Sequence, residues 1–201
     1  SINHSHQNYR RLIEQAQAQD YPNLEIIIVS NRLNSKEQII LDFLVYRDKL
    51  KRTKHLSFLK RECLSSLYNE GISCATGDYV WCIDNNVILD EITTIRNIID
   101  NFNRSKAQVI YLQDDKNLNK AQKQGLNYSP DEYPLKYPLY LIDRNDWHNC
   151  SRLVVNLKSI RLFNLHFSEG LPHLNGALFS LQIIRFLPNI YYYYQNQITF
   201  K

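Results

Sequence analysis

The stretch that decides the fold is KRECLSSLYNEGISCATGDYVWCIDNNVIL, residues 60–89. Residues 62–68 have the composition of a short helix, and Thr76-Gly77-Asp78 predicts a turn. The run from Tyr79 to Ile83 is aromatic and β-branched. It is bounded by that turn and by Asp84, a pattern typical of a strand buried on both faces. We therefore predict a helix, a turn and a buried strand, followed by a polar strand end.

The polar strand end, Asp84-Asn85-Asn86, is the first candidate for chemistry. In an open α/β sheet, ligands bind outside the carboxyl ends of the strands. A carboxylate at that place can hold a divalent cation against a diphosphate, because magnesium and manganese prefer oxygen ligands. The alternative is that Asp84 caps the helix expected over residues 90–103. The pattern thus indicates either a metal and nucleotide site or a helix cap.

The same stretch contains three motifs in a fixed order: Asn69-Glu70-Gly71-Ile72, Ala75-Thr76-Gly77-Asp78-Tyr79, and Asp84-Asn85-Asn86 after the strand. This arrangement resembles the family 2 glycosyltransferases, which have the GT-A fold. Their helix ends in Arg-Asn-x-Gly-Ile, and x-x-Ala-x-Gly-Asp-Tyr, an apolar strand and Asp-x-Asp follow. Two positions differ, because Tyr68 stands where the family has Arg and Asn86 stands where it has the second Asp. Gly71 is expected to mark a turn.

A second segment resembles the same family. A helix is predicted over residues 9–19, and Gln19-Asp20-Tyr21-Pro22-Asn23 then leads into a strand over residues 24–29. The family has Gln-x-Tyr-x-Asn followed by Glu-Ile-Ile-Ile-Val at this place. It also has one more strand before this helix, to which only Ser1-Ile2 could belong here. Because the chain begins with Ser and contains no Met, we expect that it is part of a longer polypeptide that supplies that strand.

The end of the strand over residues 24–29 is a candidate nucleoside site. In the family, two acidic residues follow this strand and contact the nucleoside. Ser30 and Asn31 occupy those positions here, and they can hydrogen-bond a base or ribose without the help of a charge. The alternative is an ordinary polar turn in which Asn34 or Ser35 caps the next helix.

The segment from Leu165 to Leu171 resembles the family's Phe-x-Glu-Gly-Leu, after which an Asp at the head of a helix acts as the general base. Asn175 and Gly176 stand at the corresponding positions, and neither can accept a proton. His173 is the nearest titratable group with a suitable intrinsic pKa, and Glu169 is the next. The alternative for His173 is a structural role.

The resemblance implies an α/β fold of the GT-A type, a Rossmann-like and mostly parallel sheet between helices in a three-layer sandwich. We expect residues 1–201 to form a single domain with a long acceptor-side loop over residues 113–138. The further elements expected are helices over 35–46, 90–103 and 179–187 and strands over 55–59, 107–112, 139–143, 152–157 and 190–194. The helix over 35–46 should bury Ile39, Ile40, Phe43 and Leu44.

The resemblance also implies ligands. The donor is a nucleotide sugar, most simply a UDP-sugar, and the acceptor is a glycan; other domains of the same protein are further partners. The cofactor is Mn²⁺ or Mg²⁺. The residues implied for nucleotide binding are Ser30, Asn31, Asn69 and Asp84, those for the metal are Asp84 and Asn86, and those at the catalytic position are His173, Glu169 and Asn175.

Composition narrows the class of protein. The hydrophobic share of 44% and charged share of 22% are those of a globular domain. A net charge of +4 without a concentrated basic stripe argues against a nucleic-acid partner. There is no apolar run of the roughly 20 residues that a transmembrane segment needs. Four cysteines without CxxC spacing indicate reduced thiols, so we predict a cytoplasmic protein, with the inner membrane surface as a further option.

Two functions follow from different classes. In the first, the chain is a working glycosyltransferase with altered ligands, inverting and metal-assisted. In the second, it is an inactive pseudo-glycosyltransferase that binds a glycan or a protein inside a larger glycan-synthesising protein. The differences from the family fall at chemical positions, whereas the apolar strands and the scaffold glycines are retained, and this contrast keeps both functions open.

Overall fold

The computed structural model describes residues 2–31, 33–59, 62–84, 86–114, 150–170, 174–187, 189–195 and 198–200. In chain order, its elements are α1 (Ile2–Gln17), β1 (Ile26–Asn31), α2 (Ser35–Arg47), β2 (Thr53–Phe58), α3 (Leu64–Cys74), β3 (Tyr79–Trp81), β4 (Val87–Leu89), α4 (Thr94–Ser105), β5 (Val109–Asp114), the 3-10 turn η2 (Cys150–Arg152), β6 (Leu153–Asn156), α7 (Leu157–Leu162), α8 (Asn175–Phe186), β7 (Ile190–Gln195) and β8 (Ile198–Phe200).

The strands form three hydrogen-bonded groups. β1 pairs with β2 in parallel, and β4 pairs with β8 antiparallel. The third group has the order β3-β6-β5-β7, in which β6 runs antiparallel to both of its neighbours and β5 is parallel to β7. The α/β fold class is confirmed, and the pairing is more mixed than a mostly parallel sheet, since three of these five pairings are antiparallel.

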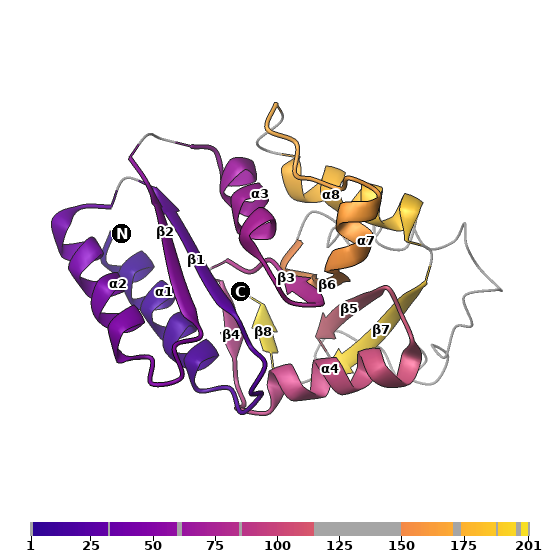
Figure 1. Cartoon of the computed structure of the whole chain (residues 1–201), viewed down its shortest axis with the longest axis horizontal. Helices are drawn as coiled ribbons and strands as arrows, with labels where there is room; N and C mark the ends of the chain where they lie inside the picture. The colour runs from indigo at the N-terminus through magenta and orange to yellow at the C-terminus, as the bar shows by residue number, and fades with distance from the viewer. Residues whose placement is uncertain are drawn as a thin grey trace.

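Helices cover both faces of the strands, as expected for three layers. Along β5, Val109 and Tyr111 belong to a core that α3, α7 and α8 complete, whereas Ile110 and Leu112 belong to a core completed by α1 and α4. This alternation follows from the two-residue repeat of a strand. Figure 1 shows α3, α7 and α8 on one side of the strands and α4 on the other.

The N-terminal helix differs from its prediction. α1 begins at Ile2 rather than at Tyr9, so Ile2 is helical and does not belong to a strand. Gly71 was expected in a turn but lies inside α3. A Cβ atom at Gly71 would lie 3.3 Å from Val29 Cγ2, so the glycine allows α3 to approach β1 closely, and a larger residue would have to displace Val29 by a few tenths of an ångström.

Two helix predictions need correction. α2 has the expected span, but its buried residues are Leu41 and Leu44, while Ile39 and Phe43 are 68% and 57% exposed. The helix expected over 90–103 begins at Thr94, with Thr93 at its N-cap, and β4 lies between Asp84 and that helix. Asp84 therefore does not cap it.

Most other elements agree with expectation to within a few residues. β2, β5, β6, α8 and β7 lie where strands or a helix were expected. The strand predicted over residues 139–143, and the loop from residue 115 to 138, lie outside the described residues. In the part of the chain that is described, every helix is too short or too polar to cross a bilayer.

Candidate active site

Ser30 and Asn31 end β1 and are strand residues, not members of a polar turn. The turn comes later, where Asn34 caps α2 by accepting from Glu37 N at 3.0 Å while its own N–H donates to Glu37 Oε2 at 2.8 Å. Asn34 is thus the cap that the sequence suggested. Ser30 and Asn31 are not part of this cap, and their side chains make other contacts.

Ser30 forms a hydrogen bond across the parallel pair β1–β2. Its Oγ lies 2.7 Å from His55 Nε2. Burial lowers the pKa of His55 below its usual value, and the nearby Asp42 carboxylate, 3.9 Å from Nδ1, offsets part of that effect. His55 is therefore neutral at pH 7, and the Ser30 hydroxyl is held at a defined position at the strand end.

Asn31 joins the end of β1 to the segment before α3. Its Nδ2 donates to the Glu62 carbonyl oxygen at 2.8 Å. One amide proton and the Oδ1 lone pairs remain for other contacts. Ser30 and Asn31 together therefore present a hydroxyl and an amide at the carboxyl edge of the strands, where ligands of α/β sheets bind.

Both polar atoms of the Asn69 side-chain amide form hydrogen bonds. Its Oδ1 accepts from Phe167 N at 2.8 Å, and its Nδ2 donates to the Phe167 carbonyl at 3.0 Å and to Glu169 Oε1 at 3.3 Å. Ser65 Oγ adds a bond to the Ser168 carbonyl at 2.7 Å. α3 thus holds the segment around residue 168 in place and keeps the exposed Glu169 carboxylate beside Asn69.

Tyr68, at the position where the family has Arg, is part of the core. Its ring stacks on Phe167 with centroids 4.7 Å apart, and Phe167 stacks on Phe179 at 4.0 Å. Burial raises the pKa of Tyr68 far above its usual value, with Cys150 and Asp84 adding to the shift. This row of stacked rings joins α3 to α8.

Asp84 lies just after β3 in a tight turn. Its Oδ1 accepts from Asn86 N at 2.9 Å, and its Oδ2 lies 3.4 Å from Asn86 Nδ2. Its negative charge contributes to the raised pKa values of Tyr68 and of Cys150, where burial is the main cause and brings the Cys150 value to about 11. Asp84 is therefore near Tyr68, which lies in the middle of α3 and precedes Asn69 in the sequence.

Few of the described side chains could act as ligands of a metal ion at this site. Among the described residues, no cluster of three or more His, Cys, Asp or Glu side chains could hold an ion. Asp84 supplies one carboxylate, and in the observed turn Asn86 turns its amide nitrogen, not its oxygen, toward that carboxylate. Magnesium commonly uses one or two carboxylates together with substrate phosphates. Asp84 fits that role with phosphate ligands, whereas Asn86 in this rotamer does not.

The structure brings together some of the sequence-predicted residues. Asn69 contacts Glu169, and the adjacent Tyr68 is influenced by Asp84. His173 lies outside the described residues, and Asn175 opens α8 with a side chain that is not described. Sequence reasoning missed His55, because its contact with Ser30 follows from the β1–β2 register, which pairs Ile28 with His55 and which no local pattern reveals.

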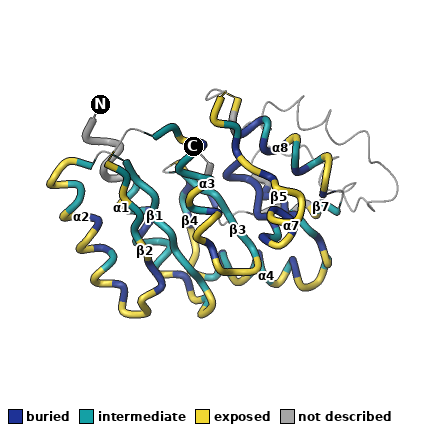
Figure 2. Tube along the Cα trace, turned by 45° about the horizontal axis from the view of Figure 1, so that its top comes forward, coloured by how far each residue is buried: buried dark blue, intermediate teal, exposed yellow. Residues whose placement is uncertain are grey.

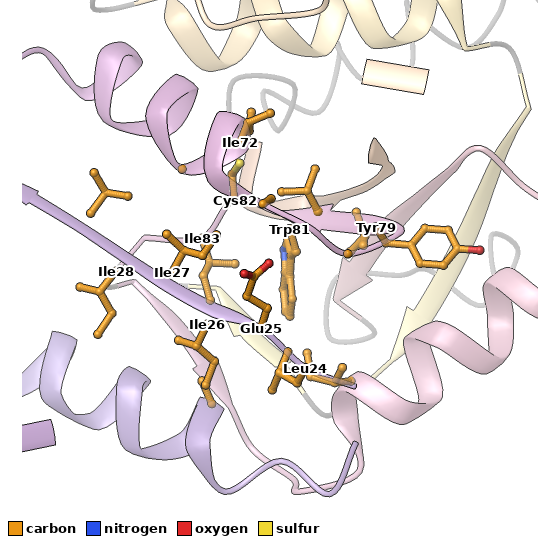
Figure 3. A pocket seen from close by; sticks show the side chains of 18 of the residues that line it. Leu24, Glu25, Ile26, Ile27, Ile28, Ile72, Tyr79, Trp81, Cys82 and Ile83 are labelled. Carbon is orange, nitrogen blue, oxygen red and sulfur yellow. The ribbon is translucent and has the colours of Figure 1, made fainter. Parts of the chain in front are cut away.

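A cavity of about 800 Å³ lies between β1 and β3. Figure 3 shows Ile26 and Ile27 of β1 on one wall and Trp81 and Cys82 on the other. Asp84 lines one end of this space, and Glu25 lines the other. The cavity therefore runs along the strands and meets the candidate site at their carboxyl ends.

Comparisons with known proteins agree with this arrangement. The family model described as glycosyl transferase family 2 matches residues 4–161. S. aureus TarS 1-349 superposes with a TM-score of 0.73 at 15% sequence identity, covering 94% of this chain and 55% of that one. The same protein in complex with UDP-GlcNAc gives 0.69 at 14% identity, covering 91% and 53%, and its UDP complex gives 0.69 at 14%, covering 92% and 56%. A search of curated proteins finds no match.

These similarities have a defined reach. At 14–15% identity the TarS structures establish a shared fold, and this chain spans about half the length of TarS 1-349. Enzymes of family 2 commonly use a divalent metal ion. The matched region begins within α1 and ends within α7, and it includes both strand ends that carry the candidate residues. The chain belongs to glycosyl transferase family 2.

Proposed function

We propose that this chain is a nucleotide-sugar-dependent glycosyltransferase domain that transfers a sugar from a UDP-sugar to a hydroxyl group of a glycan, with inversion. The observation that carries the proposal is the family match over a region in which polar side chains stand at the carboxyl ends of β1 and β3. The TarS complexes with UDP-GlcNAc and UDP support a nucleotide of this type in a related fold.

The described residues have separate roles in this proposal. Ser30 and Asn31 hydrogen-bond the nucleoside, and Asp84 lies on the diphosphate side. A divalent ion held by Asp84 and the phosphates would neutralise the charge that develops on the leaving group. Asn69 positions the segment that carries Glu169, through its two bonds to the Phe167 backbone.

The proposed reaction is a single displacement. The acceptor hydroxyl oxygen forms a bond to the anomeric carbon as the bond from that carbon to the diphosphate oxygen breaks, and the electron pair leaves with UDP. The hydroxyl proton passes to the Glu169 carboxylate, which is exposed and within hydrogen-bonding distance of Asn69. A carboxylate base of this kind contributes about 10²–10⁴ to a rate. His173 is the alternative base.

A second function is favoured by a different observation. Tyr68 packs into an aromatic stack where the family has a cation, and both Asp84 oxygens face Asn86. A domain with these features suits a non-catalytic role, in which the chain binds a glycan or a neighbouring domain of a larger glycan-synthesising protein.

Calorimetric titration separates the two functions. UDP, GDP and their sugar conjugates are titrated with and without Mn²⁺ into the wild-type chain, Asp84→Ala and Asp78→Ala. Asp78 is exposed at the opposite end of β3, so it is a matched control. We expect UDP binding that Mn²⁺ strengthens, that Asp84→Ala weakens at least tenfold, and that Asp78→Ala leaves unchanged. Equal behaviour of the two variants, or no binding at millimolar nucleotide, supports the non-catalytic function.

A further inference from the structure

Ser30, His55 and Asp42 form a row of polar side chains across three elements. Ser30 lies near the end of β1, His55 lies on β2, and Asp42 lies on α2, which packs against β2 (Figure 1). Ser30 Oγ is 2.7 Å from His55 Nε2, and His55 Nδ1 is 3.9 Å from Asp42 Oδ1. The row therefore leads from an exposed carboxylate, through a buried imidazole, to the hydroxyl group at the carboxyl end of β1.

The His55 ring makes the polarity of the Ser30 hydroxyl depend on one proton. The His55 side chain is 7% exposed, and burial lowers its pKa, so the ring is neutral at pH 7. A neutral imidazole carries a proton on one nitrogen and a lone pair on the other. If Nε2 carries the lone pair, Ser30 donates a hydrogen bond to His55. If Nε2 carries the proton, Ser30 accepts a hydrogen bond instead.

Asp42 favours one of these two tautomers. A proton on His55 Nδ1 faces the Asp42 carboxylate and is attracted to it, whereas a lone pair on Nδ1 would face its negative charge. At 3.9 Å the contact is too long for a hydrogen bond, so the carboxylate acts through its charge. Gln38 Nε2 donates to Asp42 Oδ1 at 2.8 Å and holds that oxygen in place. The arrangement therefore favours the proton on Nδ1 and the lone pair on Nε2.

We propose that Asp42 and His55 make the Ser30 hydroxyl a hydrogen-bond acceptor toward the nucleoside, and that this acceptor selects uracil over cytosine. The Ser30 proton is directed at His55 Nε2, so its oxygen lone pairs remain for the base. Uracil has an N–H group at N3, whereas cytosine has a lone pair there. This inference rests on the proposed function and adds two positioning residues to it.

The two positioning residues give the serine a property that it lacks alone. An isolated serine hydroxyl rotates freely and can donate or accept, so it would hydrogen-bond N3 of either base. With its proton held by His55, Ser30 offers only lone pairs, as a carboxylate does. Two lone pairs would then face each other in the cytosine complex, and a buried acceptor without a donor is costly. The row thus replaces the charge of an acidic residue with a fixed orientation.

Protonation of His55 should reverse the polarity of Ser30. In the imidazolium both ring nitrogens are donors, so Nε2 would donate to Ser30 Oγ and release the hydroxyl proton toward the base. Asp42 is the ionisable group that faces the ring from α2, and the uncharged Ser30 faces it from β1. Because the pKa of His55 lies below about 6.5, the preference for uracil should be complete at pH 7.5 and decline toward pH 5.5.

The first test measures the tautomer without any nucleotide. Long-range proton–nitrogen NMR spectra of the labelled chain distinguish a protonated from an unprotonated ring nitrogen of His55. We compare the wild-type chain with Asp42→Asn and with Asp100→Asn, which removes an exposed charge from α4. We expect the proton on Nδ1 in the wild type and in Asp100→Asn, and a larger share on Nε2 in Asp42→Asn. A wild-type proton on Nε2 would overturn the inference, whatever the activity of the chain.

The second test measures the preference between bases. UDP, CDP and 3-methyluridine diphosphate, in which N3 has no proton, are titrated calorimetrically at pH 7.5 and 5.5. The three ligands carry the same diphosphate, so ratios of their affinities cancel its titration. We expect UDP to bind about tenfold or more tightly than the other two at pH 7.5, with a smaller ratio at pH 5.5. Asp42→Asn should reduce the ratio, His55→Phe should abolish it, and Ser57→Ala, an exposed change on β2, should leave it unchanged.

The outcomes separate this inference from the proposed function. If UDP binds but 3-methyluridine diphosphate binds equally well, the inference is wrong and the proposed function stands. If the ratio stays the same in Asp42→Asn and in His55→Phe, the two residues have no part in base selection, and the inference is again wrong. Because Asp42 is 62% exposed, Asp42→Asn should fold even if His55→Phe does not. If the chain binds none of the three ligands, both the inference and the proposed function are overturned.

Discussion

β1 and β5 are similar strands in very different surroundings. β1 contains three isoleucines and a valine, and β5 has Val109, Ile110, Tyr111 and Leu112. Those four β5 residues are 0–3% exposed, whereas every residue of β1 is only half-buried. Figure 2 shows the difference, because the trace of β1 is teal and that of β5 is dark blue. β5 has a strand on each side, while β1 has β2 on one side and the cavity on the other.

The difference teaches that neighbours, more than composition, set the burial of a strand. The comparison also shows that two kinds of interaction hold the elements together, namely apolar burial and polar contacts. The β5 region is stabilised by apolar burial on both faces. The connection between α1 and β1 is joined to the start of α4 by polar contacts. Gln19, which is 4% exposed, donates to the Glu91 carbonyl at 2.9 Å and accepts from Ile95 N at 3.0 Å. Arg96 Nε donates to Asp20 Oδ2 at 2.9 Å.

The largest expected effect tests the comparison directly. Ile110→Ala should lower the free energy of unfolding by about 2–5 kcal/mol, because it leaves a cavity in a fully packed core. Ile27→Ala should cost about 1 kcal/mol, since Ile27 is only half-buried and loses less contact. Urea unfolding of both variants measures the difference. Equal losses would mean that β1 is as tightly packed as β5.

A second variant tests the polar connection. Gln19→Ala should cost about 1–3 kcal/mol, because Gln19 is buried and the part-buried Ile95 amide and Glu91 carbonyl each lose one hydrogen bond. Gln38→Ala is the matched control, since Gln38 makes one exposed bond to Asp42 in its own helix and should change stability by less than about 0.5 kcal/mol. Thermal unfolding of the two variants gives the comparison. If both behave alike, the polar contacts contribute little to joining the two regions.

The smallest effect concerns the partnered side of β1, where Ser30 contacts His55. The folded-state pKa of His55 lies below its unfolded value of about 6.5, so the unfolded chain binds the proton more readily. The stability that neutral His55 contributes is present above that pH and is lost as the pH falls through it. Urea midpoints between pH 7.5 and 5.5 should therefore decline, and less steeply in His55→Gln.

His166→Gln is the control for this pH effect. His166 is exposed and bonds to the Asn164 carbonyl at 2.9 Å, so the substitution should leave the decline unchanged. If the urea midpoint of His55→Gln declines with pH as steeply as that of the wild-type chain, His55 is not the group that titrates.

The sequence predicted the elements better than their surroundings. β5, β6 and β7 were found because apolar runs bounded by polar residues are strong local signals. Gly71 was misplaced because a glycine is also needed where two elements approach closely, and its neighbour Val29 is far away in the sequence. The face of α2 was misassigned because its apolar residues surround the helix, and only packing against Ile13 of α1 selects Leu41 and Leu44 for burial.

For the candidate site, too, the sequence supplied some of the information and the tertiary structure supplied the rest. The sequence by itself indicated the family and proposed Ser30, Asn31, Asp84 and Glu169 as site candidates, because motifs and spacing are properties of the chain. Only the tertiary structure decided that His55 holds Ser30, that Asn69 holds the segment of Glu169, and that Tyr68 has become a core residue. It also decided that β1 and β3 line a shared cavity. Such contacts join residues distant in sequence, so they depend on register and packing that no local pattern encodes.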